Sequence, residues 1–127
     1  MTNDVYRKKR EELEKRTKEL AIKTINVCGG VPRTIPNNVV TTQLIRSCCS
    51  IGANYREACE PESKVDFCHK LGIAKKEANE TLYWLEILAE TNPAIKDKIR
   101  PIYAEAKEIL LIFAKAIATS KSSLSSK

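Results

Sequence analysis

Helix-breaking residues leave four long segments of this chain uninterrupted, and this spacing constrains the fold more than any other feature of the sequence. The breakers are Gly29, Gly30, Pro32, Pro36, Pro61, Pro93 and Pro101. The segments that they leave cover approximately residues 1–28, 37–60, 62–91 and 93–120. A β-sandwich or barrel requires turn signals about every 8–12 residues, and a parallel α/β domain requires short apolar strand runs between its helices. The sequence has neither pattern, which predicts an all-α chain.

Apolar residues recur within these segments at the spacing of one helix face. In the last three segments this face consists of Val40, Leu44, Ser47, Cys48, Ile51, Tyr55 and Ala58, then Phe67, Leu71, Ala74, Ala78, Leu82, Leu85 and Ala89, then Ile102, Ala106, Ile109, Phe113 and Ile117. The first segment has a weaker seven-residue repeat, formed by Tyr6, Leu13, Leu20 and Val27 with Thr17 and Thr24 between them. These faces form the predicted core.

Short connections between the segments favour antiparallel neighbours, so we predict an antiparallel up-down-up-down four-helix bundle. A chain of 127 residues holds one such domain, which we predict over residues 1–119. Residues 120–127 lack apolar periodicity and are predicted to form a disordered tail. Pro101 is expected either to kink the last helix or to begin it afresh after a short turn.

The ends and the cysteines of the sequence indicate a cellular compartment. The N-terminus lacks an apolar signal core, and no stretch of about 18 residues is both uncharged and apolar, so we expect neither secretion nor a membrane partner. Five cysteines are an odd number, which fits reduced thiols better than a disulfide framework. We therefore expect a cytoplasmic protein.

Basic residues outnumber acidic ones by 22 to 16, which gives a net charge of +6 and permits a polyanionic partner such as RNA or DNA. The candidate nucleic-acid-binding residues are Arg7, Lys8, Lys9, Arg10, Lys15, Arg16, Lys18, Arg46, Arg56, Lys75 and Lys76. Five acidic residues interleave with eight basic ones over residues 1–23. The alternative for that stretch is a solvated helix face with ion pairs between neighbouring turns.

Some residues lie away from the predicted core faces or interrupt them with polar groups. Four apolar residues lie off the core stripes, which makes them candidates for a subunit interface: Ile73, Trp84, Ile87 and Leu111.

Asn54 lies at the edge of a core face, where a hydrogen bond across helices could fix the register. Its possible partners are Asn79 and Glu57, and the sequence leaves the choice between them open.

The most distinctive motifs are Ser50-Ile51-Gly52-Ala53-Asn54, then Glu57-Ala58, then the segment KKEANETLYWL from Lys75 to Leu85. With these motifs, residues 43–88 closely resemble the small bacterial four-helix-bundle proteins encoded in intervening sequences of 23S ribosomal RNA genes. The resemblance implies an antiparallel bundle that assembles as a homopentamer, without established enzyme activity. A related branch, the accessory variability proteins of diversity-generating retroelements, binds a reverse transcriptase and nucleic acid.

Catalytic chemistry has little support in the sequence. A di-metal site in a bundle requires carboxylates from four helices and two Glu-x-x-His pairs, whereas Asp66 and His69 form the one pair of this type here. The cysteines show no C-x-x-C spacing. We therefore expect no cofactor, no metal and no catalytic residue.

The leading hypothesis is a non-enzymatic homo-oligomeric scaffold, pentameric if the resemblance holds, with weak sequence-independent nucleic-acid binding and contacts to protein partners. One alternative is an accessory protein that binds a reverse transcriptase together with its RNA or DNA. The other is a metal-dependent enzyme that uses Asp66 and His69.

Overall fold

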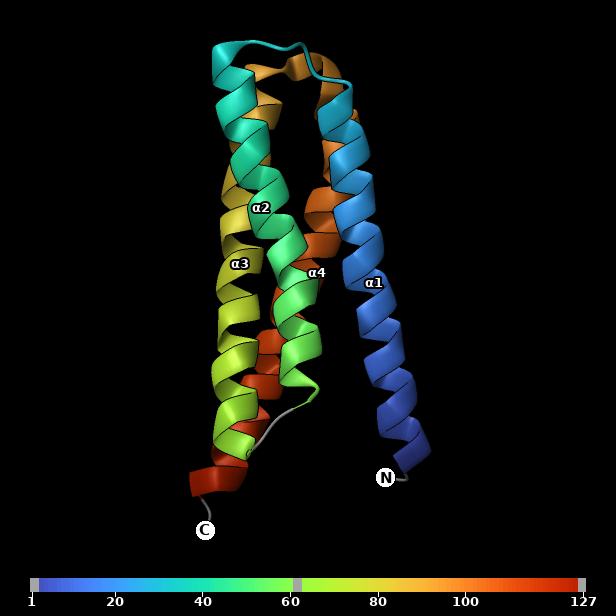
Figure 1. The fold of residues 1–127 in the computed structure, drawn as a ribbon, viewed down its shortest axis with the longest axis vertical. Helices are drawn as coiled ribbons and strands as arrows, with labels where there is room; N and C mark the ends of the chain where they lie inside the picture. The colour runs from blue at the N-terminus through green and yellow to red at the C-terminus, as the bar shows by residue number, and fades with distance from the viewer. Residues whose placement is uncertain (1–2, 61–62, 126–127) are drawn as a thin grey trace.

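The chain folds into four long helices and one short one. The structure is a computed structural model that describes residues 3–60 and 63–125. Its helices are α1 (Asn3–Gly29), α2 (Ile35–Ala58), α3 (Lys64–Thr91), the 3-10 helix η1 (Pro93–Ile95) and α4 (Lys96–Ser125). Figure 1 shows that consecutive long helices alternate in direction and that both ends of the chain lie at the same end of the bundle. The predicted all-α fold is confirmed, and the described residues contain no strand.

Helices α2 and α3 each begin at a side chain that binds one of their free N–H groups. The hydroxyl of Thr34 accepts a hydrogen bond from the backbone N–H of Asn37 at 3.2 Å and caps α2. Ser63 caps α3 in the same way, through the N–H of Asp66 at 3.0 Å. The expected start of the second helix, near Pro36, is therefore close to the observed one, and the cap itself is Thr34.

Pro101 lies inside α4, so this helix does not begin afresh there. Proline lacks the N–H that would bond the carbonyl four residues earlier, which belongs to Asp97 in the first turn. Both residues are exposed, so water can take the place of the missing donor. The short 3-10 helix η1 directly precedes α4 and starts at Pro93, one of the predicted helix breakers.

The predicted tail is wrong for residues 120–125, because α4 continues to Ser125. This stretch contains no glycine or proline that would stop the helix. It also runs beside the start of α3, where the Lys64 ammonium donates a hydrogen bond to the Ser123 hydroxyl at 3.1 Å. The ordered bundle therefore extends beyond the predicted domain end at residue 119, and residues 126–127 lie outside the described part of the chain.

The core lies between the predicted faces of the helices. Its largest fully buried side chains include Leu44, Ile51, Leu71, Leu85, Ile109 and Phe113. The ring of Phe113 on α4 stacks on that of Tyr55 on α2, with centroids 5.4 Å apart and planes 11° from parallel. This stack joins two helices across the bundle, an arrangement that buries the two rings together.

The seven-residue repeat of α1 is buried along only part of that helix. Leu20, Thr17 and Thr24 are buried, and each threonine hydroxyl donates to a carbonyl one turn earlier, at 2.9 Å for Leu13 and 2.8 Å for Leu20. Tyr6, by contrast, is 60% exposed. Figure 1 shows why, since the N-terminal end of α1 diverges from the rest of the bundle.

Gly52 on α2 allows α1 to approach closely. A Cβ atom built on Gly52 would lie 3.0 Å from Oγ1 and 3.2 Å from Cβ of Thr17. Glycine costs about 1 kcal/mol relative to alanine inside a helix. The close packing against the buried Thr17 offsets this cost.

Candidate nucleic-acid interface

The predicted basic residues do not form a single patch. On α1, Arg7 pairs with Asp4 at 3.3 Å, and two further pairs join neighbouring turns of the same helix. These are Arg10 with Glu14 at 3.9 Å and Lys15 with Glu19 at 4.0 Å. The ion-paired face that the sequence offered as an alternative is therefore present over much of α1.

Arg16 and Arg46 tie helices together. The Arg16 guanidinium donates to both carboxylate oxygens of Glu105 on α4, at 3.0 and 2.7 Å. Arg46 on α2 binds Glu77 at 3.1 Å and also Glu80, both on α3. Both arginines hold neighbouring helices in register and are largely neutralised, so they contribute little to binding a polyanion.

Hydrogen bonding from Arg16 lowers the pKa of the Glu105 carboxyl below its ordinary value of 4.5. A carboxyl whose pKa is lower in the folded state stabilises the fold above its unfolded pKa, and this contribution disappears as the pH falls through the folded pKa. Both side chains are partly exposed, so we expect Arg16→Gln to reduce the free energy of unfolding by only about 1 kcal/mol near pH 7.

Urea denaturation of the wild type and of Arg16→Gln, at about pH 7 and at about pH 2.5, measures this pH dependence of stability. The difference in stability between wild type and Arg16→Gln should shrink at the lower pH, because protonated Glu105 no longer pairs with Arg16. A difference that stays constant between the two pH values would show that the ion pair does not stabilise the fold.

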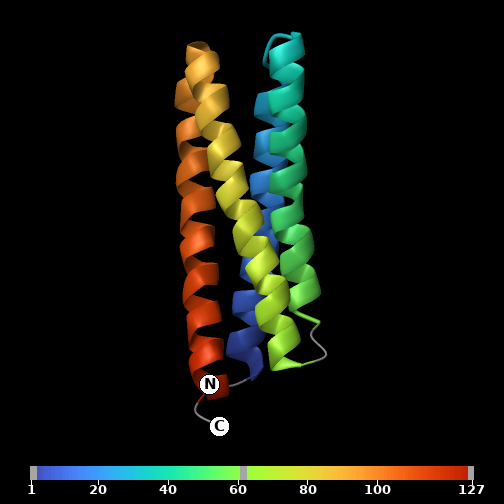
Figure 2. The same ribbon diagram turned by 90° about the vertical axis from the view of Figure 1, so that its left-hand side faces the viewer.

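Two of the predicted lysines lie together in a groove between α3 and α4. Lys75 and Lys76 line this groove of about 450 Å³ with Lys121, and the polar side chain of Asn79 lies beside them. The remaining lining residues are Cys68, Gly72, Leu110 and Ile117. None of these lining residues is acidic, so the groove concentrates positive charge. Figure 2 shows α3 and α4 lying side by side.

Lys121 was missed by the sequence analysis because it falls in the stretch predicted to be disordered. Its position four residues after Ile117 was the available signal, since this spacing places both on one side of a continuing helix.

Lys18 and Arg56 form a separate basic pair in the groove between α1 and α2, where Glu14 lies beside them. Lys8 and Lys9 are exposed on the diverging end of α1.

The predicted structural polar residues act differently from the expectation. Asn54 donates to the carbonyl of Ser50 at 2.8 Å within its own helix, so the expected bond across helices is wrong. Glu57 accepts from Lys70 at 3.4 Å. Polar contacts that do cross helices in the core join the hydroxyls of Thr81 and Ser47 at 3.0 Å and the Cys48 thiol to the Thr24 hydroxyl at 3.4 Å. Short hydroxyls reach a neighbour at close helix spacing, whereas the longer Asn54 side chain folds back.

The predicted interface residues occupy two helices. Trp84 is half-buried against the core, and its indole N–H donates to Glu80 at 2.9 Å. This bond is the main reason why the pKa of Glu80 is lowered. Ile87 is half-buried and Ile73 exposed on the same helix, whereas Leu111 is 57% exposed on α4. The structure therefore leaves apolar surface free on both α3 and α4.

Among the residues considered for metal and thiol chemistry, Asp66 has an ion-pair partner, and two of the cysteines are buried. The Asp66 carboxylate lies 3.5 Å from the Lys70 ammonium, while His69 is exposed. Burial raises the pKa of the Cys28 and Cys48 thiols to about 11, which keeps them protonated near neutral pH. The described residues hold no group of three or more metal-ligating side chains. Within the same residues, every helix is too short or too polar to span a membrane.

Comparison with known proteins places this bundle in a family. The model of the 23S rRNA-intervening sequence protein family matches residues 9–115. A crystal structure of a protein of unknown function from the S23 ribosomal protein family of Bacteroides thetaiotaomicron is similar, with 35% identity and a TM-score of 0.78. The similarity covers 87% of this chain and 98% of that one. No protein with a curated functional description matches the sequence. The chain therefore belongs to the 23S rRNA-intervening sequence protein family.

Proposed function

We propose that this protein is a non-enzymatic, homo-oligomeric helical scaffold that binds the phosphate backbone of RNA through the groove between α3 and α4. The observation that carries the proposal is that Lys75, Lys76 and Lys121 line one groove without an acidic residue among them. Lysine ammonium groups bind phosphate as point charges, which gives affinity without base recognition.

The shape of the groove supports backbone binding rather than reading of bases. Base-specific or stacking sites require aromatic side chains beside cations, whereas the lining residues of this groove include no aromatic ring. Leu110 and Ile117 form an apolar floor, and the lysine stems can cover it while their charges stay in water. We therefore expect binding to be nearly independent of sequence.

Assembly would strengthen this weak site by repetition. Five copies of a chain with a net charge of +6 carry +30, and each copy presents the same groove. Linked sites raise the effective concentration of the second contact, so a ring can bind a long RNA even where a single groove binds weakly. The apolar surface of Ile73, Trp84, Ile87 and Leu111 supports self-assembly, and the number of five copies follows from the family resemblance.

Salt dependence tests the binding mode. For single-stranded RNA, log K falls with log salt with a slope of about −0.7 per phosphate neutralised, so three lysines give a slope of about −2 per groove. Raising the salt from about 50 mM to about 200 mM should then weaken binding at least about 20-fold. Fluorescence anisotropy with a labelled single-stranded RNA of mixed sequence measures this. Affinity that does not change with salt, or undetectable binding at the lower salt, would contradict the proposal.

A further inference from the structure

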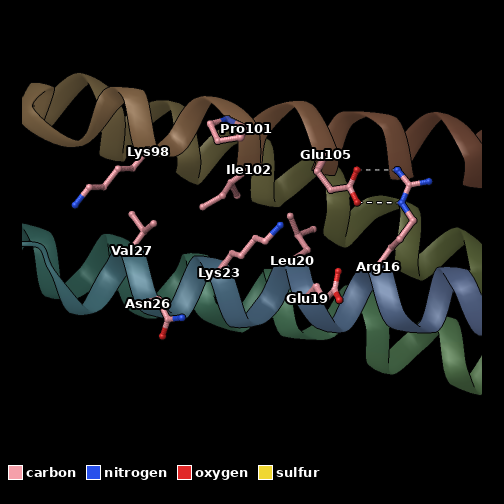
Figure 3. A pocket seen from close by; sticks show the side chains of 10 residues that line it. All are labelled: Arg16, Glu19, Leu20, Lys23, Asn26, Val27, Lys98, Pro101, Ile102 and Glu105. Atoms are coloured by element: carbon pink, nitrogen blue, oxygen red, sulfur yellow. Dashed lines mark hydrogen bonds and ion pairs between the residues drawn. The ribbon is translucent and has the colours of Figure 1, made fainter.

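A second groove lies between α1 and α4, away from the lysines of the proposed RNA site. α1 packs less closely on α4 than on α2, and a space of about 410 Å³ remains between them. Figure 3 shows Leu20 and Val27 projecting from α1 toward α4, and Ile102 projecting from α4 toward α1. Leu20 and Ile102 are buried, so the floor of the groove is apolar. This volume and an apolar lining with a few polar groups are typical of small-molecule sites.

One end of the groove is closed by charges that already have partners. Arg16 and Glu105 bridge the two helices there, as the dashed lines in Figure 3 mark. Lys23 extends from α1 toward this end, and its charge contributes to the lowered pKa of Glu105. Arg16 and Glu105 form a polar wall whose two charges are paired, whereas Lys23 forms no ion pair in the described part of the chain and adds a positive charge to the groove.

The opposite end carries a cation without such a partner. Lys98 is exposed, and its amino group lies over the gap beyond Val27 in Figure 3. Its sequence neighbour Asp97 pairs with Arg100 at 3.0 Å. Lys98 forms no ion pair with any residue in the described part of the chain. An unpaired ammonium therefore adjoins an apolar strip.

We propose that this groove binds a short aliphatic carboxylate, whose carboxylate group pairs with Lys98 and whose tail lies on Val27 and Ile102. The ammonium at one end selects an anion, and the apolar floor selects a tail that ends before the Arg16–Glu105 wall. A stable protein–protein interface buries about 1,200 Å² or more, and a narrow floor of already buried side chains is unsuited to it. A small amphipathic anion fits the groove better than a second protein.

Methyl NMR on the full chain tests this site, with octanoate as the probe. Titration should shift the methyl signals of Leu20, Val27 and Ile102 in a saturable manner, whereas octylammonium and acetate should leave them unchanged. Lys98→Gln should weaken octanoate binding about fivefold, the value of one partly exposed ion pair. Lys96→Gln is the matched control, because it removes an ammonium from the same helix that does not line the groove.

Several outcomes would overturn the proposal. These are an absence of shifts with octanoate, equal shifts with octylammonium, and equal weakening by Lys96→Gln. Far-ultraviolet circular dichroism of both variants confirms that the helices remain folded.

Discussion

Replacing Phe113 with alanine is expected to lower the free energy of unfolding by about 3–5 kcal/mol. The Phe113 side chain is 1% exposed, and its ring stacks on Tyr55. Truncation removes the apolar contacts of the ring and leaves a cavity between α2 and α4. The surrounding long helices cannot collapse fully into this space, because their spacing is also set by other buried residues such as Ile51 and Ile109.

Urea denaturation followed by circular dichroism at a fixed protein concentration measures this loss of stability. Tyr83→Ala provides the control, since it removes an aromatic ring that is 57% exposed and should cost less than about 1 kcal/mol. If Phe113→Ala and Tyr83→Ala reduced stability equally, the position assigned to Phe113 at the centre of the core would be wrong.

Replacing Trp84 with lysine is expected to convert the proposed oligomer into a monomer of 14.3 kDa. The indole is half-buried beside Glu80, and Ile87 and Ile73 extend the apolar surface along α3. A large aromatic side chain at the centre of an interface contributes several kcal/mol to binding, and a lysine in its place puts a charge where the interface would have to bury it. Light scattering coupled to size-exclusion chromatography gives the mass of each variant.

Two further variants distinguish loss of assembly from loss of folding. Leu111→Lys changes a side chain that is mostly exposed, so it should leave the fold intact and still disrupt the assembly. Ile25→Lys is the matched control, because Ile25 is exposed on α1 and lies outside the proposed interface. A wild type that runs as a monomer would disprove the interface, as would dissociation caused equally by Ile25→Lys.

The helices were predictable because their breaks and core faces are local features of the sequence. Gly29, Pro93 and the spacing of residues such as Leu71, Ala78 and Leu85 act within one or two turns. The errors arose where the outcome depends on tertiary packing. Tyr6 continues the repeat of α1 but lies where that helix diverges, and residues 120–125 form a helix beside the start of α3.

The candidate site was predictable only in part, because ion pairs between helices cannot be read from spacing along one of them. Arg46 lies 31 and 34 residues from the carboxylates that neutralise it, while Lys75 and Lys76 form no ion pair among the residues that the structure describes. The same limit applies to Asn54, which bonds the Ser50 carbonyl within α2 rather than a group on another helix. Residue type identified the basic set, and the fold decides which members can bind a polyanion.

RNA binding by the charge-reversed variant Lys75→Glu/Lys76→Glu tests the proposed function most directly. The control Arg33→Glu/Lys96→Glu has the same net charge, and its two positions do not line the groove. At low salt we expect the groove variant to bind single-stranded RNA more than about tenfold more weakly than wild type, with a salt slope that falls by about 0.7 for each lysine replaced. The control should stay within about threefold of wild type. Equal loss of affinity in both variants would show that net charge, and not the groove between α3 and α4, determines binding.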